Sequence, residues 1–391
     1  MNKVRLFFAG DFCSKPSTSK IAVSDELKNL IQSCDLKVVN FEVPLKPEVK
    51  LPPQKRERFF QNDDAPDFLR GLGFNLFSQA NNHAFDWGDE GFKKTKAVLG
   101  DAAFGAGTYE EAYQVKVVEV QGVKIGFYAL SFAAYKGVFD DVMNHEGLGC
   151  AYINDLRVNH DIMEAKKQLD YLFILPHEGI EYVDVPTPET IARYRDFIDY
   201  GADGVIAAHP HCPQGWEEYK GKPIFYSLGN FFFNSKATYD FRATKPHWYE
   251  GLCVVMTIAD KRLSWEVVNT KNVDNVGVEI DQAEDRDKHN KQNCRYLFDK
   301  AEYYGYFTKV CKQLGLGKEM YIIDKTFHPN SLSKCTLLVL KYWFDKIRRK
   351  DFTNDEELEY LIKNEQRKNI VIRSINYRRK KLISSNSKRK N

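Results

Sequence analysis

The sequence predicts an α/β sandwich, and three observations lead to this fold class. Short apolar runs alternate with segments of helical spacing through the first 280 residues, as they do in layered α/β domains. Two pairs of runs are close enough in sequence to be antiparallel, which argues against a purely parallel sheet. Five of the runs end at a cluster of polar residues, and ligands bind at that edge of open α/β sheets.

Each strand is predicted from a short apolar run. Single strands are expected at 4–9, 36–41, 76–79, 171–175, 204–208 and 224–227. Antiparallel pairs are expected for 115–120 with 124–130, across the Gln121-Gly122 turn, and for 252–258 with 263–268. Helices are predicted from apolar residues three and four apart, with capping residues or glycines at several ends. They cover 21–34, 65–72, 89–99, 159–168 and 188–200.

The composition changes near residue 280, which predicts a domain over 1–280 and a helical C-terminal region over 281–391. Glycine becomes rare there, and helical spacing recurs at 294–304, 337–347 and 356–362. Residues 366–391 carry ten Lys and Arg and no Asp or Glu. This basic tail is either a solvated terminus or a contact for anionic lipid or polymer. Nucleic acid is not favoured as a partner, because no aromatic residues interleave the last ten positions.

The location expected from the sequence is cytoplasmic, with membrane association through the basic tail as the open alternative. No stretch approaches the roughly 18–20 uninterrupted apolar residues of a membrane-spanning helix. The apolar run near the N-terminus is too short for the core of a signal peptide. The eight cysteines include no C-x-x-C pair, so free thiols in a reducing compartment are expected.

Six polar clusters in the first 230 residues suggest a metal site, since they combine carboxylate, amide and imidazole donors. Their candidate donors are Asp11, Asn40, Glu42, Asn82, His83, His177, His209, His211 and Asn230. Such a mixed set suits Mn, Fe or Zn better than Ca or Mg. Two ions about 3.5–4 Å apart would need a bridging carboxylate, for which Glu42 is the candidate. Taken singly, each residue is more often a turn former or a hydrogen-bonded structural group.

Motifs for several other chemistries are missing from the sequence. Gly105-Ala106-Gly107 lacks the spacing of a dinucleotide-binding loop, and there is no Walker A motif, so a nucleotide cofactor is not supported. Glu178 and Glu181 follow His177, but no His-Glu-x-x-His motif is present, so a zincin protease is not indicated.

The order of the motifs resembles the bacterial capsule-synthesis family associated with poly-γ-glutamate (the CapA-type proteins), over roughly residues 1–260. The motifs are Phe8-Ala9-Gly10-Asp11, Val39-Asn40-Phe41-Glu42, Ala80-Asn81-Asn82-His83-Ala84-Phe85-Asp86-Trp87-Gly88, His177-Glu178-Gly179-Ile180-Glu181-Tyr182, Gly201-Ala202-Asp203-Gly204-Val205-Ile206 with His209-Pro210-His211, and Tyr226-Ser227-Leu228-Gly229-Asn230-Phe231. The family is in turn similar to the calcineurin-like metallophosphoesterases. That similarity implies a four-layer αββα core with a dinuclear metal site.

Carried across motif by motif, the resemblance implies a role for each candidate residue. One ion would bind Asp11, Glu42 and His211, and the other would bind Glu42, Asn82, His177 and His209. His83 would be the phosphate-facing catalytic histidine. The resemblance also leaves Asn40, Asp86, Glu181 and Asn230 as residues that orient the ligands or contact substrate.

This sequence departs from the phosphoesterase pattern at two ligand positions. Cys13 stands where those enzymes have a histidine, and Glu42 stands where they have an aspartate. One ion would lose an imidazole ligand unless Cys13 supplied a thiolate, and a packed thiol is the preferred reading of Cys13. The expected cofactor is therefore one or two divalent ions (Mn, Fe or Zn).

Two functions of different classes follow from the resemblance. The first is a metal-dependent hydrolase in capsule or other surface-polymer biosynthesis, in which a metal-bound hydroxide would attack a phosphoester or γ-amide bond and His83 would be the electrophile or general acid. The alternative is a non-catalytic factor that binds the polymer or assembles the synthase. The expected partners are an anionic polymer or phosphorylated substrate, and membrane-bound synthase proteins reached through the basic tail.

Overall fold

The computed structural model describes residues 3–15, 17–51, 58–133, 137–140, 145–234, 245–274 and 276–315. The chain divides into two compact units, residues 1–52 with 57–299 and residues 53–56 with 300–391. In the second unit the described part is helix α8 (Lys300–Gly315). The helices predicted at 337–347 and 356–362, and the basic tail, lie outside the described residues.

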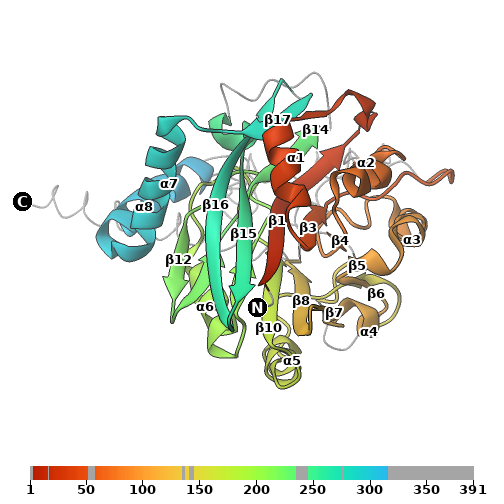
Figure 1. The fold of residues 1–391 in the computed structure, drawn as a ribbon, viewed down its shortest axis with the longest axis horizontal. Helices are drawn as coiled ribbons and strands as arrows, with labels where there is room; N and C mark the ends of the chain where they lie inside the picture. The colour runs from red at the N-terminus through yellow and green to blue at the C-terminus, as the bar shows by residue number, and fades with distance from the viewer. Residues whose placement is uncertain are drawn as a thin grey trace, which may run out of the picture. The chain divides into compact units, whose positions relative to one another are not determined.

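The larger sheet of the first unit is built around β1 (Figure 1). Its strand order is β2-β17-β16-β15-β1-β3-β4-β5, and β14 pairs with β1 outside this path. The strands are β1 (Lys3–Ser14), β2 (Ala22–Val23), β3 (Leu36–Phe41), β4 (Leu76–Ser78), β5 (Ala103–Phe104), β14 (Asn230–Asn234), β15 (Glu250–Ala259), β16 (Arg262–Val273) and β17 (Gly277–Ile280). β1 pairs antiparallel with β15 up to Ala9 and parallel with β14 from Asp11 onward. Asp11 therefore lies at the point along β1 where its neighbour changes from β15 to β14.

The smaller sheet has the order β12-β13-β11-β10-β8-β7. Its inner strands β8, β10, β11 and β13 are parallel, while β7 and β12 pair antiparallel at the edges. The strands are β7 (Lys116–Val120), β8 (Val123–Ser131), β10 (Tyr171–His177), β11 (Gly204–Ile206), β12 (Trp216–Tyr219) and β13 (Lys222–Phe225). A separate short pair joins β6 (Ala106–Gly107) to β9 (Gly149–Cys150).

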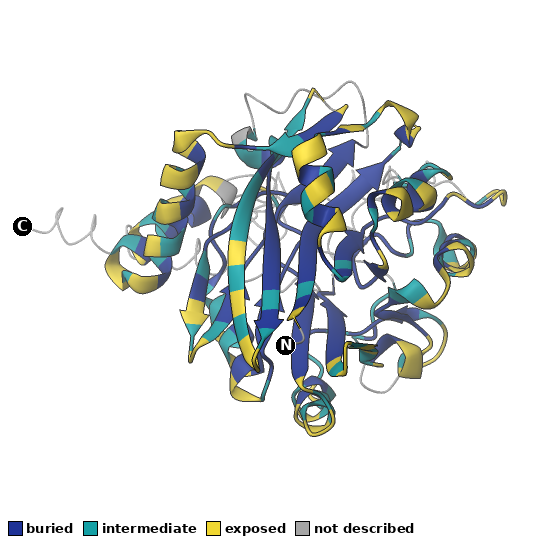
Figure 2. Cartoon of the chain, in the orientation of Figure 1, coloured by how far each residue is buried: buried dark blue, intermediate teal, exposed yellow. Residues whose placement is uncertain are grey.

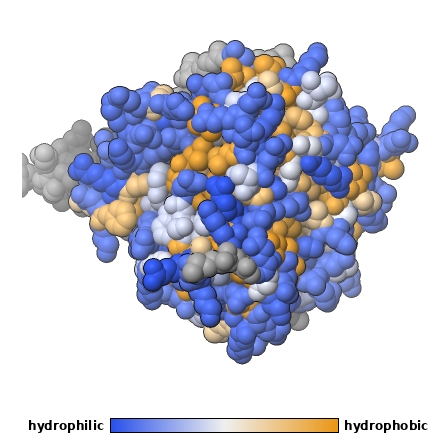
Figure 3. Space-filling model, in the orientation of Figure 1, coloured by the Kyte–Doolittle hydropathy of each residue, from blue (hydrophilic) through white to orange (hydrophobic). Residues whose placement is uncertain are grey.

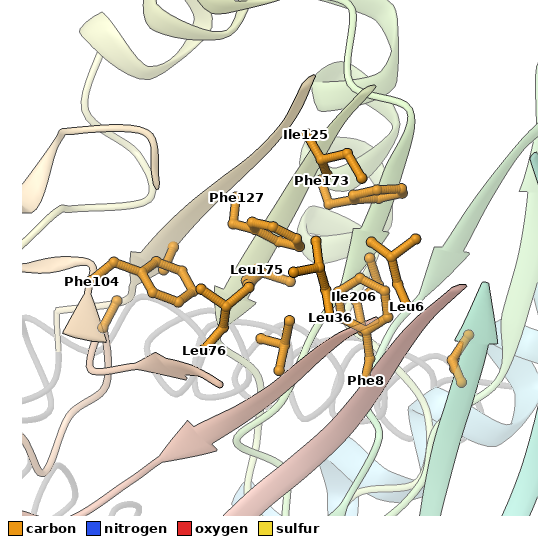
Figure 4. Packing of buried hydrophobic residues seen from close by; sticks show 14 of the residues in the cluster. Leu6, Phe8, Leu36, Leu76, Phe104, Ile125, Phe127, Phe173, Leu175 and Ile206 are labelled. Atoms are coloured by element: carbon orange, nitrogen blue, oxygen red, sulfur yellow. The ribbon is translucent and has the colours of Figure 1, made fainter. Parts of the chain in front are cut away.

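The main hydrophobic core lies between the two sheets (Figure 4). Phe8 from β1 packs against Phe127 from β8 and Phe173 from β10, with ring centroids 6.2 and 5.6 Å from the Phe8 ring. All three side chains are buried, and each contributes about 1.5–3 kcal/mol through burial of its apolar surface. This packing fixes the two sheets face to face.

Helices cover the outer faces of both sheets. Leu27 and Ile31 of α1, with Leu69 of α2, pack in a second core against β1 and β3, while α5 contacts β10 and α6 contacts β11. The helices are α1 (Asp25–Gln32), α2 (Ala65–Leu72), α3 (Gly88–Leu99), α4 (Tyr109–Ala112), α5 (Arg157–Lys166), α6 (Pro188–Asp199) and α7 (Glu284–Phe298), with short 3-10 turns η1 (Thr18–Lys20), η2 (Gly100–Ala102) and η3 (Pro246–Tyr249). Figure 2 shows the strands mostly buried and the helices exposed along their outer sides. The predicted four-layer α/β sandwich is confirmed.

The first predicted helix begins later than expected. Residues 21–34 were expected to be helical, but Ala22–Val23 forms β2 beside β17, and α1 begins at Asp25. Ser24 caps this helix by accepting a hydrogen bond from the Leu27 amide. The backbone amides of residues 22 and 24 bond to Val276 and Val278, so pairing with a distant strand overrides the local helical spacing.

The domain boundary predicted at residue 280 stays a prediction, and α7 belongs to the first unit.

None of the helices among the described residues combines the length and apolar character needed to cross a membrane. On the face drawn in Figure 3, hydrophilic residues cover most of the surface and hydrophobic residues gather between them. The seven cysteines of the described part are free, and six of them are buried.

Candidate metal centre

The ends of parallel strands bring the predicted donors together in one buried place. Asp11 lies in β1, Glu42 directly follows β3, and Asn82 and His83 lie in the turn after β4. His177 ends β10, and His209 and His211 follow β11. Each of these residues is at most 8% exposed. The donors therefore come from both sheets and meet where the sheets' carboxyl ends adjoin.

Glu42 lies at the centre of this group. Its Oε1 is 3.5 Å from His211 Nε2 and 3.9 Å from His177 Nε2. Neither of its carboxylate oxygens has a hydrogen-bond partner among the described residues, although both are buried. One ligand atom each from Glu42, His209 and His211 lie within 4.8 Å of one another. A buried carboxylate without a donor is costly, and a cation between these groups would remove that cost.

Asp11 is fixed more firmly than Glu42. The Asn40 amide donates to its Oδ1 at 2.7 Å, and the His209 backbone amide donates to its Oδ2 at 3.1 Å. His211 Nδ1 lies 3.4 Å from the same Oδ2. Burial raises the pKa of Asp11. Burial, followed by the charge of Asp11, raises the pKa of Glu42 well above its ordinary value. Too little positive charge surrounds the Asp11 and Glu42 carboxyl groups for both to ionise easily.

Asn230 determines which nitrogen of His211 is available as a ligand. The Asn230 Nδ2 group donates to the backbone oxygens of Trp248, at 3.0 Å, and His211, at 3.4 Å. The amide oxygen therefore faces His211 Nδ1 at 2.9 Å and accepts its proton. The lone pair of the ring is therefore on Nε2, which faces Glu42. This hydrogen-bonding pattern is the one expected of a metal-ligating histidine.

His177 has a different hydrogen-bonding pattern. Its Nε2 lies 2.9 Å from Asn82 Oδ1 and 3.1 Å from His209 Nδ1. Three potential ligand atoms therefore lie close together. The Asn40 amide lies 3.1 Å from His177 Nδ1. Because Asn40 also donates to Asp11, His177 accepts at Nδ1 and carries its proton on Nε2. Burial lowers the pKa of His177 well below its ordinary value, so the ring is neutral. Ligation through Nε2 requires this proton to move to Nδ1.

The backbone of the His209-Pro210-His211 segment is strained. His209 has a φ of 105° and His211 a φ of 55°, in the region that side chains other than glycine rarely occupy. Each such residue costs about 1–3 kcal/mol. In this conformation one ligand atom of each imidazole lies within 4.8 Å of a Glu42 carboxylate oxygen.

His83 is oriented by Asp86. Its Nδ1 lies 2.9 Å from Asp86 Oδ2, and its Nε2 lies 4.0 Å from Glu42 Oε1. The Asp86 carboxylate also accepts from the Phe59 backbone amide at 3.0 Å, and the Phe59 ring meets the His83 ring edge to face. Asp86 therefore holds the His83 proton on Nδ1 and leaves Nε2 facing the centre.

The last two residues that the sequence singled out are Glu181 and Cys13. Burial is the main cause of the raised pKa of Glu42 and of the lowered pKa of His211; the charge of Glu181 adds to the first shift and opposes the second. Cys13 is fully buried and packs with Val43, Phe233 and Trp248. Burial raises the pKa of its thiol well above the ordinary value. This geometry supports the interpretation of Cys13 as a packed, neutral thiol.

We expect Asn230→Ala to weaken cation binding without removing any ligand atom. Loss of the Asn230 oxygen frees the His211 ring to turn and to change tautomer, and losses of this kind cost roughly 10–100-fold in metal affinity. Calorimetric titration with Mn²⁺ or Zn²⁺ measures the change. Asn75→Ala, at an exposed asparagine, is the control and should leave the affinity unchanged. Equal affinities for Asn230→Ala and the unmodified protein, with affinity lost in His211→Ala, would contradict the role of Asn230.

The sequence did not reveal the aromatic side chains that wall the centre. Trp248 and Tyr182 lie against His211, with ring centroids 5.0 and 6.2 Å away, and Phe132 lies 4.5 Å from His209. In the sequence, Trp248 stands beside His247 and Tyr249 just before β15, which is a pattern typical of an ordinary aromatic cluster before a strand. Its contact with His211 depends on the pairing of β14 with β1, which has no local sequence signal.

Comparison with known proteins agrees with this arrangement of motifs. The family model "Bacterial capsule synthesis protein PGA_cap" matches residues 5–235. The chain is 30% identical over 223 residues to "Capsule biosynthesis protein CapA" of Bacillus anthracis, covering 54% of this chain and 53% of that protein. It is 30% identical over 216 residues to "PGA biosynthesis protein CapA" of Bacillus subtilis (strain 168), covering 52% of this chain and 55% of that one. The chain thus spans about half the length of these relatives.

A solved structure described as a novel phosphatase from Mycoplasma pneumoniae is also similar, with a TM-score of 0.42 and 15% sequence identity. The match covers 69% of this chain and 94% of that chain. This likeness is too weak to assign an activity. The family match, in contrast, covers more than half of the sequence and contains every candidate ligand of the centre. The chain therefore belongs to the bacterial capsule synthesis protein family PGA_cap.

Proposed function

We propose that this protein is a metal-dependent hydrolase in the biosynthesis of a capsule or another surface polymer, and that it cleaves a phosphoester or γ-amide bond. The observation that carries the proposal is the buried Glu42 carboxylate, which has no hydrogen-bond partner among the described residues and faces imidazole nitrogens. A structural carboxylate would be paired with a donor. The lack of a donor supports the proposal that Glu42 is a ligand.

The residues around Glu42 fit a divalent cation of the Mn, Fe or Zn type. Glu42, His209 and His211 would hold the ion, with Asp11, Asn82 and His177 as further ligands. Carboxylate, amide and imidazole donors together favour these metals over Ca²⁺ or Mg²⁺. When bound, such an ion acts as a Lewis acid and activates water for hydrolysis.

His83 is the residue proposed to handle a proton. Its Nδ1 proton is held by Asp86 at 2.9 Å, so Nε2 is the nitrogen that faces the centre. Its side chain is 10% exposed, against 2% for His177 and 5% for His211, which leaves it more open to substrate than those ligands. In hydrolysis, water adds to phosphorus or to the carbonyl carbon, the P–O or C–N bond breaks, and the leaving atom takes a proton. Because Nε2 has no proton in this tautomer, His83 can take a proton from the attacking water at Nε2 and pass the same proton to the leaving atom.

A cavity of about 770 Å³ has Trp87, four residues after His83, in its lining, and its charge suits an anionic substrate. It is lined by Lys46, Lys50, Arg58 and Lys94 together with the rings of Phe60 and Trp87. Two acidic residues, Glu48 and Asp63, also line it, and Lys94 pairs with Asp63. The Lys46 ammonium lies 5.3 Å from the centre of the Phe60 ring and 5.2 Å from that of the Trp87 ring. The excess of cationic groups would attract a phosphorylated or polycarboxylate chain.

The same cavity favours a second candidate function, in which the protein binds an anionic polymer without cutting it and helps to assemble the synthase. The basic tail at 366–391 would then contact the membrane surface or the synthase proteins. This alternative requires neither a bound ion nor His83, so the two functions can be separated experimentally.

The test measures bound metal and turnover on the same preparations. Elemental analysis gives the metal content, and phosphomonoester, phosphodiester and γ-glutamyl amide substrates are assayed with added Mn²⁺. We expect His83→Ala to retain metal and to lose about 10²–10⁴-fold in turnover. His160→Ala, at an exposed histidine on α5, is the matched control and should be unchanged. A metal-free protein without turnover, whose binding of polyglutamate is lost in Lys46→Glu, would refute the hydrolase and leave the assembly role.

A further inference from the structure

A second cluster of metal-type donors lies among residues that the first centre does not use. It contains Asp184 from the segment between β10 and α6, His247 from η3, and His289 from α7. One ligand atom of each lies within 4.8 Å of the others. All three side chains are partly exposed, at 14% for Asp184, 33% for His247 and 19% for His289. An ion could reach them from solvent.

Glu250 orients both imidazoles from one side. His247 Nδ1 lies 2.9 Å from Glu250 Oε2, and His289 Nδ1 lies 3.6 Å from the same oxygen. The two rings are stacked, with centroids 4.0 Å apart and planes 17° from parallel. With both Nδ1 atoms turned toward Glu250, both Nε2 atoms point away from it. The Glu250 carboxylate holds the Nδ1 proton of His247 and so fixes the tautomer of His247 that ligates through Nε2, while His289 Nδ1 has no hydrogen-bond partner among the described residues.

Asp184 lies at the other end of the imidazole pair. Its Oδ2 is 3.2 Å from His289 Nε2, and the Asn293 amide lies 3.2 Å from the same nitrogen. Glu250 is itself held by the Arg286 guanidinium, which also lies 3.6 Å from Asp281. Glu250 is thus engaged as an orienting group, while Asp184 faces the nitrogen that can ligate.

The charges around His289 favour a cation at this place. His289 lies between two carboxylates, with its Nε2 3.2 Å from Asp184 and its Nδ1 3.6 Å from Glu250. Two stacked imidazoles repel each other if both are protonated. A single divalent ion supplies the positive charge while both rings stay neutral.

We propose that Asp184, His247 and His289 bind a second divalent cation of the Zn²⁺ class, formed by different residues from the Glu42 centre. Two imidazoles and one carboxylate are a common ligand set for Zn²⁺ and related first-row ions. Tyr182 lies two residues from Asp184, and Trp248 lies next to His247; both rings pack against His211. The ion therefore joins α7 and η3 to the segment that walls the first centre, and it has a structural role.

The proposal is tested by counting ions in the full chain after chelator treatment and reloading with Zn²⁺, and by Co²⁺ absorption spectra. We expect His289→Gln to bind one ion fewer than the unmodified protein and to keep the ion that depends on Glu42. Glu42→Gln should show the reverse. This count does not depend on turnover, so failure of the hydrolase proposal leaves it intact. An unchanged ion count in His289→Gln would overturn the second site.

Thermal unfolding separates an ion site from a plain salt bridge. We expect Zn²⁺ to raise the unfolding temperature of Glu42→Gln, because the second site is intact there. Combining Glu42→Gln with His289→Gln, or with His247→Ala, should abolish that rise. If His289→Gln lowers the unfolding temperature equally with and without chelator, the cluster is only a salt bridge and the proposal fails.

Discussion

Replacing Glu42 by glutamine should abolish cation binding at the first centre and at the same time make the metal-free protein more stable. The carboxylate is buried without a hydrogen-bond partner among the described residues, and it lies close to the Asp11 carboxyl group. Glutamine keeps the shape and removes the charge, so the repulsion and part of the desolvation cost disappear. We expect the free energy of unfolding in the presence of chelator to rise by about 1–3 kcal/mol.

The control for this result is a second buried glutamate, Glu217, which is fully paired. Arg195 donates to both of its carboxylate oxygens, at 2.8 and 2.6 Å, and the Tyr226 hydroxyl donates at 2.6 Å. Glu217→Gln should therefore destabilise the protein by about 1.5–3 kcal/mol with metal binding unchanged. Chemical denaturation with and without Mn²⁺ measures both variants. A loss of stability of the metal-free protein in Glu42→Gln would show that Glu42 is a structural residue and not a ligand.

Gly10→Ala should be among the most damaging single substitutions in the chain. A Cβ atom at this position would lie 1.9 Å from the carbonyl oxygen of Gly229 and 2.9 Å from its carbonyl carbon. That oxygen already accepts from the Asp11 amide at 3.0 Å, so the backbone cannot move away without losing this bond. We expect a loss of about 3 kcal/mol or more in the free energy of unfolding, together with weaker cation binding because Asp11 is displaced.

Gly71→Ala is the matched control for Gly10→Ala. Gly71 lies in α2, and nothing lies within 4 Å of the position its Cβ would take. Alanine is favoured over glycine in a helix by about 0.5–1 kcal/mol, so this variant should be at least as stable as the unmodified protein. Urea denaturation of both variants provides the comparison. If Gly10→Ala unfolds at the same urea concentration as Gly71→Ala, the close approach of Gly229 does not constrain the fold.

The parts of the fold that the sequence predicts well are those with a strong local signal. The strand at 36–41 and the helix at 65–72 have the predicted bounds, because the apolar spacing agrees with the flanking cap and glycine. β14 and β17 were not predicted. β14 pairs with β1, and β17 pairs with β2 as well as with the adjacent β16. No local pattern specifies the pairings with β1 and β2, which are far away in the sequence.

The convergence of the donors could also be predicted, because parallel strands deliver their following residues to one edge of a sheet. Asp11, Glu42 and His211 indeed lie within a few ångströms of one another. Their roles as ligands stay predictions. The tautomer of His211 and the stacking of His247 on His289 could not be predicted, since each depends on hydrogen bonds between segments that are far apart in the sequence.

The position of β1 has a consequence for the order in which the protein is completed during synthesis. β1 leaves the ribosome before β14 and β15, yet Lys3 pairs with Ala259 and Asp11 pairs with Asn230. A nascent chain that ends before β15 holds its first strand with one edge unpaired, and such an edge can associate with other chains. The strand that carries Asp11 is therefore made more than 200 residues before β14 and β15 can pair with it, so ribosome-bound chaperones have a long interval in which to protect its open edge.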